Sequence, residues 1–224
     1  MNQVTDQQII EILRKEAVPA LGCTEPVACA LACAKCKEVL GGVPERLDVL
    51  VSGNIYKNGM GVGIPGTGMV GLPIAAALGA VCGKSEYGLE VLKEVNVGDN
   101  LQRAKDMLGQ VTVSLKEDAP DKLYAEALAT KGNDRVKVII AHTHTNIVLV
   151  EKNGEEIFKR EFRLDTSKPE DKGPELSVKR IWDFVHEVDV KDIEFVLQGA
   201  EMNKAISAEG LNSEYEIGRA SCRE

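Results

Sequence analysis

The stretch TEPVACALACAKCKEVLGG (residues 24–42) and the strand-like RLDVLVSG (46–53) after it decide the fold class of this chain. A helix is predicted from about 26 to 40, because Thr24 or Glu25 can cap its start, a proline suits its first turn and two glycines end it. The alternating residues of RLDVLVSG predict a strand. The chain therefore starts its main body with a small-residue helix followed by a strand.

Three cysteines share one face of this predicted helix, since Cys29, Cys33 and Cys36 follow one another at intervals of four and three residues. Cys29 and Cys36 would lie about 10 Å apart along the axis. Sulfurs that share one metal ion, with bonds of about 2.3 Å, must lie much closer than that. Because a free cysteine packs as a small hydrophobic residue, the favoured prediction is that these three belong to the core.

Cys23 differs from them because it precedes the helix. Unpaired N–H groups and the positive end of the helix dipole favour a thiolate there, and the thiolate is the form that attacks substrates or binds metals. The pattern leaves two alternatives open, a reactive or metal-ligating cysteine and a buried structural one. Thr24 and Glu25 are interpreted as capping residues.

A glycine-rich loop, NIYKNGMGVGIPGTGMVG (54–71), is predicted before the small-residue helix LPIAAALGAVCG (72–83). Its literal G-x-G-x-x-G does not directly follow the strand and lacks the acidic partner of a dinucleotide site. We expect instead that backbone N–H groups of the turn at Thr67 and Gly68 bind a substrate carboxylate. The alternative is that these glycines serve only close helix packing.

Three polar side chains of the same loop are candidates for binding and catalysis, namely Asn54, Lys57 and Asn58. A desolvated Lys57 can act as a base, with Asn54 as the second catalytic candidate. Asn58 is predicted to bind substrate, because an asparagine can orient an amine or a carboxylate. A hydrated turn without function is the alternative.

From residue 110 the periodicity changes to that of strands, with a hairpin turn predicted at Asn153-Gly154. His142 and His144 are expected on one side of a strand, where a polar sheet face is favoured over a pair of metal ligands. A charged linker and two further helices, about 176–187 and 191–208, complete the pattern. The predicted class is α+β, a small-residue-rich and incomplete helical domain with an inserted antiparallel-sheet α+β unit.

The predicted organisation has four parts. Residues 1–95 form the first part of a helical catalytic domain, 96–165 the α+β unit, and 166–215 a linker and helices that return to the catalytic domain. Residues 216–224, EIGRASCRE, resemble the translation of a sequencing adapter and are interpreted as a non-native tail on a truncated reading frame.

Composition excludes several functional classes. A net charge of -8 and a pI near 5.1 provide no basic surface for phosphates, so nucleic-acid binding is not expected. The uncharged run 59–83 contains too many glycines and prolines for a spanning helix, so no membrane association is predicted. The polar, amphipathic N-terminus has a capping box at Thr5 and Gln8 and does not look like a secretion signal, which favours the reducing cytoplasm.

The segments LGCTEP (21–26), SGNIYKNGMGVGIPGTGMVGLPIAAALGA (52–80) and HTHTNIV (142–148) together resemble the iron-sulfur serine dehydratase alpha-chain-like family, in the branch similar to L-cysteine desulfidase. The resemblance implies a [4Fe-4S] cluster held by three cysteines. Cys23 matches the first ligand, and the other two are expected in a C-terminal half that the chain lacks. The open iron of such a cluster acts as a Lewis acid in the α,β-elimination of a small amino acid.

The resulting functional prediction is a lyase that converts L-cysteine to pyruvate, ammonia and sulfide, or L-serine to pyruvate and ammonia. The resemblance implies that the chain by itself is an inactive fragment of such an enzyme. A small amino acid is the expected partner, and a homo-oligomer is anticipated. A non-catalytic accessory protein that retains the fold is the alternative, and a nicotinamide-linked oxidoreductase is a further one that the missing ribose-binding acid disfavours.

Overall fold

The computed structural model describes residues 4–160 and 176–212, and the chain divides into two compact units. One unit comprises 20–165, and the other combines 1–19 with 166–224. Helices and a mixed sheet make the chain an α+β protein, which confirms the predicted class.

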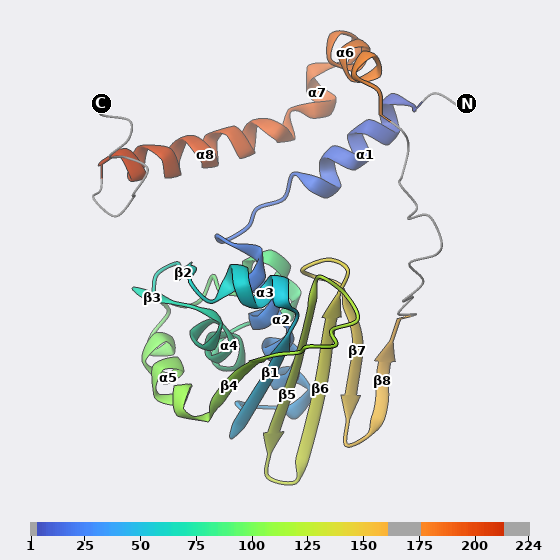
Figure 1. The fold of residues 1–224 in the computed structure, drawn as a ribbon. Helices are drawn as coiled ribbons and strands as arrows, with labels where there is room; N and C mark the ends of the chain where they lie inside the picture. The colour runs from blue at the N-terminus through green and yellow to red at the C-terminus, as the bar shows by residue number, and fades with distance from the viewer. Residues whose placement is uncertain (1–3, 161–175, 213–224) are drawn as a thin grey trace. The chain divides into compact units, whose positions relative to one another are not determined.

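A six-stranded sheet organises the unit 20–165, with the strand order β4-β1-β5-β6-β7-β8 (Figure 1). The sheet is mixed rather than purely antiparallel, because β1 pairs parallel to β4 and antiparallel to β5, while the remaining neighbours are antiparallel. The strands are β1 (Arg46–Val51), β4 (Val111–Leu115), β5 (Tyr124–Lys131), β6 (Asp134–Ala141), β7 (Ile147–Lys152) and β8 (Glu155–Lys159).

The sheet crosses the boundary that the sequence predicted near residue 95. Strand β1 belongs to the predicted helical part, yet it forms a central strand of the sheet whose other members follow residue 110. The sequence pattern does not reveal this pairing, because β1 and β5 are separated by more than seventy residues and share only alternation. The hairpin between β7 and β8 is as predicted, with positive φ angles at Asn153 (54°) and Gly154 (87°).

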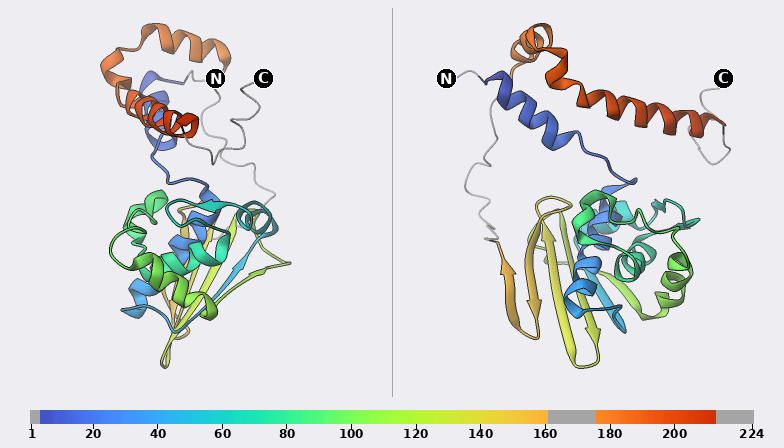
Figure 2. Two further views of the ribbon diagram at one scale, coloured as in Figure 1. Left: turned by 90° about the vertical axis from the view of Figure 1, so that its left-hand side faces the viewer. Right: turned by 180° about the vertical axis from the view of Figure 1, so that it is seen from behind.

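Helices α2 (Thr24–Leu40) and α4 (Leu72–Val81) pack together on the sheet, as the views in Figures 1 and 2 show. Small side chains allow this close approach. The sheet presents Ala125, Ala127 and Ala129 to the core, and a Cβ atom at Gly79 would overlap the backbone of Ala30. The small-residue composition of both helices is therefore a packing requirement.

Helix α2 begins earlier than predicted, with Cys23 itself as the N-cap residue and without a capping bond from a side chain. The prediction that Thr24 or Glu25 caps the helix is therefore wrong. Its end is as predicted: Gly41 adopts a left-handed conformation (φ 72°), and the N–H of Gly42 donates to the carbonyl of Lys37 at 3.1 Å.

The segment predicted as a continuous glycine-rich loop contains a short helix, α3 (Gly53–Gly59). Ser52 starts it by accepting a hydrogen bond from the backbone N–H of Ile55 at 3.4 Å, and Ile55 is buried. The remainder forms the two-stranded sheet of β2 (Gly63–Ile64) and β3 (Met69–Val70). The loop prediction was wrong because a serine cap and one buried isoleucine suffice for two helical turns.

Short helical elements lead from α4 to β4. The first is a 3₁₀ segment, η1 (Ser85–Glu90), which Gly88 interrupts with a φ of 53°. Helix α5 (Asn100–Met107) follows, and a 3₁₀ turn, η2 (Leu108–Gln110), leads into β4.

The second unit contains α1 (Asp6–Glu16), α6 (Val178–Glu187), α7 (Val190–Ile193) and α8 (Phe195–Asn212). The capping box of Thr5 and Gln8 is present as predicted. Phe184 packs against Val4, Ile9 and Ile10, and the guanidinium of Arg180 donates to the carbonyl of Val4 at 2.6 Å. The linker near 161–175 and the proposed adapter tail lie outside the described residues.

None of the helices in the described parts of the chain is long and apolar enough to cross a membrane. The uncharged run 59–83 falls on several short elements.

Candidate functional site

Polar side chains from three separate segments meet at the N-terminal end of α2. We call them the entrance cluster: Cys23, Thr24 and Glu25 at the start of α2, Asn58 on α3, and His144 in the turn after β6. Asn58 is exposed and the other members are partly buried. A thiol, a carboxylate, an imidazole, an amide and a hydroxyl thus lie close together at a surface that small molecules can reach.

The thiol of Cys23 donates a hydrogen bond to Oε2 of Glu25 at 2.8 Å. Burial, the bond to Glu25 and the negative charge of that carboxylate together raise the pKa of Cys23, although backbone N–H groups of Glu25 and Thr24 act in the opposite direction. The helix N-terminus therefore does not lower the pKa of Cys23 below its ordinary value. Partial burial and a neighbouring anion outweigh the helix end, and the thiol keeps its proton at neutral pH.

Glu25 holds the centre of the entrance cluster. Its Oε1 accepts a hydrogen bond from Nδ2 of Asn58 at 3.2 Å while its other oxygen accepts the thiol proton of Cys23. The bond from Cys23 is the main reason that the pKa of Glu25 is lowered, and Asn58 and His144 add to the effect. Glu25 is therefore an ionised carboxylate with both oxygens oriented.

His144 faces Thr24, with 3.2 Å between Nε2 and the threonine hydroxyl. Burial lowers the pKa of His144, while the charge of Glu25 partly opposes the shift. The imidazole is therefore neutral at pH 7, and one of its ring nitrogens can accept a proton.

The two histidines do not share a strand face as predicted, because β6 ends at Ala141 and both lie in the following turn. His142 has a positive φ of 70° and places Nδ1 2.6 Å from the carboxylate of Asp121. The turn sends His142 and His144 to different partners, so alternation along a strand does not apply here.

Asn54 and Lys57, the predicted catalytic residues, are both exposed on α3. Asn54 lies one helical turn before Asn58, so the two amides share a face of α3. Asn58 contacts the entrance cluster through its hydrogen bond to Glu25. The catalytic roles of Asn54 and Lys57 stay predictions.

Thr67 and Gly68, the predicted carboxylate-binding turn, lie between β2 and β3. The Thr67 hydroxyl is buried and donates to the carbonyl of Ile64 at 2.7 Å, while it accepts from the N–H of Met69 at 2.9 Å. Gly68 adopts a left-handed conformation with a φ of 65°. These bonds hold the turn together, and substrate binding there stays a prediction.

The cysteines of the described residues do not fit a complete [4Fe-4S] cluster. Such a cluster takes three thiolate ligands in the predicted arrangement, whereas Cys29, Cys33 and Cys36 are fully buried in the core and Cys82 is nearly so. Burial also raises the pKa of each of these thiols. No group of three potential metal ligands occurs among the described residues, so Cys23 as a cluster ligand stays a prediction.

Sequence reasoning missed Glu25, Thr24 and His144 as members of a site, because it treated the first two as capping residues and the third as part of a sheet face. The local signal for Glu25 was present, since a carboxylate two residues after a cysteine can reach its thiol. The contact from His144 had no local signal, because 120 residues separate it from Thr24.

Curated relatives of this chain carry the name UPF0597 protein. One from Parabacteroides distasonis is 46% identical over 221 residues, which cover 96% of this chain and 50% of the relative. One from Dichelobacter nodosus is 44% identical over 222 residues (97% and 51%), and one from Bacteroides fragilis is 41% identical over 217 residues (96% and 50%). The chain spans about half the length of the curated relatives it matches. No family model matches the chain, and no solved structure matches it.

These relatives correct the resemblance drawn from the sequence. Proteins that are 41–46% identical over nearly the whole chain bear the UPF0597 name and not that of the iron-sulfur serine dehydratase family. The assignment to that family and to its L-cysteine desulfidase branch is therefore wrong, and the matches give no support to a truncated reading frame. Short motifs rich in glycine and proline misled the assignment, because tight turns and close helix packing require the same residues in many proteins.

Proposed function

We propose that this chain contributes to a lyase that carries out α,β-elimination on a small amino acid, L-cysteine or L-serine, and that the reaction takes place at the entrance cluster. The observation that supports the proposal is the convergence of a protonated thiol, an ionised carboxylate and a neutral imidazole at one accessible place. Such an elimination requires a group that accepts a proton and a group that donates one.

Electrostatics suit the two charged groups of an amino acid. The carboxylate of Glu25 attracts the ammonium group, and the positive end of the α2 dipole attracts the substrate carboxylate. Asn58 keeps Glu25 in place through its bond to Oε1. A zwitterion that is held at both ends exposes its Cα–H and its β-substituent to the rest of the cluster.

The proton transfers follow from the protonation states. Neutral His144 accepts the proton from Cα, the electron pair of that bond forms the Cα=Cβ double bond, and the β-substituent leaves with the electrons of its bond to Cβ. The thiol of Cys23 donates its proton to the leaving hydroxide or hydrosulfide, and the His144 imidazolium then returns a proton to Cys23 through the solvent. The released enamine tautomerises and hydrolyses to pyruvate and ammonia.

The resemblance that implied an inactive fragment is wrong, and every residue of the entrance cluster lies within this chain, so activity is expected from the chain itself. The test is pyruvate formation from L-cysteine and L-serine by the 224-residue chain, purified without oxygen and with its iron content measured. Cys23→Ala and His144→Gln are expected to lower the rate at least about 100-fold, the usual effect of removing an acid or base. Cys82→Ala and His186→Gln are matched controls, because Cys82 is buried in the core and His186 lies exposed in the other unit.

Equal rates in the Cys23→Ala variant and the unaltered chain would contradict the proposal. If neither L-cysteine nor L-serine yields pyruvate, the alternative of a non-catalytic accessory protein is favoured. We further propose a cytoplasmic location, supported by the five described cysteines, which are all free thiols as expected in a reducing compartment.

A further inference from the structure

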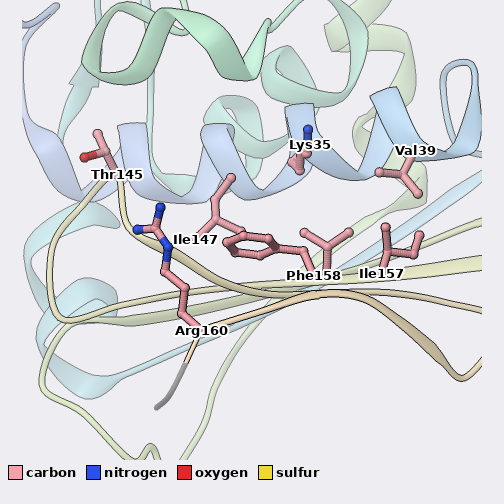
Figure 3. Close-up of a pocket in the computed structure, with 8 residues that line it drawn as sticks. Lys35, Val39, Thr145, Ile147, Ile157, Phe158 and Arg160 are labelled. Atoms are coloured by element: carbon pink, nitrogen blue, oxygen red, sulfur yellow. The ribbon is translucent and has the colours of Figure 1, made fainter. Parts of the chain in front are cut away.

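A pocket of about 510 Å³ lies between α2 and strands β7 and β8 (Figure 3). The volume falls within the range of about 300–1,000 Å³ that is usual for small-molecule sites. Side chains of α2 form one wall and side chains of the strands and of the turn before β7 form the other. The lining residues are Lys35, Val39, Thr145, Ile147, Val150, Ile157, Phe158 and Arg160.

The pocket has a polar end and an apolar end. Figure 3 shows the guanidinium of Arg160 reaching towards Thr145 at one end, whereas Val39 and Ile157 lie at the other. Ile147 and Phe158 lie between the two ends. A ligand that matched this lining would carry a polar group at one end and hydrocarbon along the rest of its length.

The charge at the polar end is positive. NH1 of Arg160 donates to the side-chain oxygen of Asn146 at 2.7 Å, and this amide orients the guanidinium without neutralising it. A guanidinium has five N–H donors in a planar fork, so it can also bind a carboxylate. Lys35 adds less charge, since its ammonium is 3.3 Å from the carboxylate of Glu38.

Two apolar side chains of the lining, one at the apolar end and one in the middle, are exposed to solvent. Ile157 is 56% exposed and Phe158 39% exposed, although both line a concave surface next to the core. Covering these side chains with hydrocarbon yields about 25 cal/mol for each Å² of apolar surface removed from water. An aliphatic chain therefore gains affinity by covering Ile157 and Phe158.

We propose that this pocket binds an amphipathic monoanion, an aliphatic carboxylate whose head group contacts Arg160 and Thr145 and whose chain lies along Ile147 and Phe158. The site shares no residue with the entrance cluster and does not depend on the proposed lyase activity. The net charge of -8 disfavours anion binding in general, so the attraction of this site for a carboxylate has to come from the nearby guanidinium of Arg160.

The experiment is a titration of the 224-residue chain with octanoate, followed by calorimetry and by amide chemical shifts. We expect saturable binding to one site, with the largest shifts at Ile147, Phe158 and Arg160. Arg160→Gln is expected to weaken octanoate binding at least tenfold, because a charged hydrogen-bonding partner of the carboxylate is lost. Arg135→Gln, at an exposed arginine of the same sheet, is the matched control and should leave the affinity unchanged.

Octan-1-ol has the same chain without the charge and separates the two parts of the proposal. Octanol is expected to bind the unaltered chain at least tenfold more weakly than octanoate does. Its affinity for the Arg160→Gln variant should equal its affinity for the unaltered chain. Equal affinities of octanol and octanoate for the unaltered chain would overturn the carboxylate assignment. Absence of saturable binding, or shifts confined to the entrance cluster, would overturn the site itself.

Discussion

Helix α2 has cysteines in two regions that can be compared, the entrance at its N-terminus and the buried interior of the helix. Cys23 is partly exposed and bonded to a carboxylate, whereas Cys29, Cys33 and Cys36 are 0% exposed among alanines and aliphatic side chains. Burial is the main cause that raises the pKa of all four thiols. The reactivity of the thiol at the entrance therefore depends on Glu25, whereas the stability of the interior depends on how well the side-chain volumes fill the core.

The largest effect is expected where α2 and α4 touch. A Cβ atom at Gly79 would overlap the backbone of Ala30, and a backbone cannot move aside as a flexible side chain can. Gly79→Ala is expected to lower the free energy of unfolding by about 3 kcal/mol, measured by urea denaturation followed by circular dichroism. Gly109→Ala, where nothing lies within 4 Å of the added atom, is the control and should change it by less than about 1 kcal/mol.

A smaller effect on the free energy of unfolding is expected when an interior cysteine of α2 is replaced by serine, and a still smaller one when Cys23 is replaced. Cys33→Ser places a hydroxyl among apolar neighbours and is expected to cost about 2 kcal/mol of unfolding free energy. Cys23→Ser keeps a donor for Glu25 at a partly exposed position and should cost less than about 1 kcal/mol. Equal costs at the two positions in the same denaturation experiment would show that the entrance is packed as tightly as the interior.

This contrast also explains what the sequence could predict. Periodicity placed Cys29, Cys33 and Cys36 on one face, and their burial confirms that they belong to the core. The helix after residue 72 and the strands after residue 110 were predicted for the same reason, because each carries its own pattern.

Features that depend on distant residues were not predictable in the same way. The parallel pairing of β1 with β4 and the contact of His144 with Thr24 join segments that no local pattern connects. The raised pKa of Cys23 was not predictable, because the helix end was visible in the sequence while the burial of the thiol and its hydrogen bond to Glu25 were not. Asn58 donates to Glu25, and its predicted role in substrate binding stays a prediction.

The reactivity of Cys23 provides a sharper test of the entrance. Glu25→Gln removes the negative charge that helps to raise the pKa of the thiol. The midpoint of the pH dependence of the rate of alkylation by iodoacetamide should therefore fall. The experiment uses a Cys222→Ser background, with Cys23 modification followed by mass spectrometry. We expect several-fold faster alkylation at pH 7.5 in the variant, while burial keeps Cys29, Cys33 and Cys36 unmodified in both proteins.

Asn58→Ala, which keeps the Glu25 charge, is the matched variant and should change the alkylation rate less. A pH profile that Glu25→Gln leaves unchanged would mean that burial alone sets the pKa of Cys23. The entrance and the interior of α2 would then differ only in exposure.

The smallest expected effect concerns the pH dependence of stability. The folded chain lowers the pKa of His144 below its ordinary value of 6.5, so the unfolded chain binds a proton more readily as the pH falls below that value. The stabilisation associated with the neutral imidazole is present above about pH 6.5 and is lost as the pH falls through the folded-state pKa. Because His144 is partly exposed, solvent limits this contribution to less than about 1 kcal/mol.

In the unaltered chain the free energy of unfolding should fall as the pH is lowered below about 6.5, and in the His144→Gln variant it should fall less. Urea denaturation at intervals of about half a pH unit measures this difference. His186→Gln, at an exposed histidine whose ring lies 4.4 Å from that of Trp182, is the control for the loss of an imidazole. If the two variants change the pH profile equally, His144 is no more buried in solution than a surface histidine. The entrance cluster would then hold a carboxylate and a thiol without the neutral imidazole that proton abstraction from Cα requires.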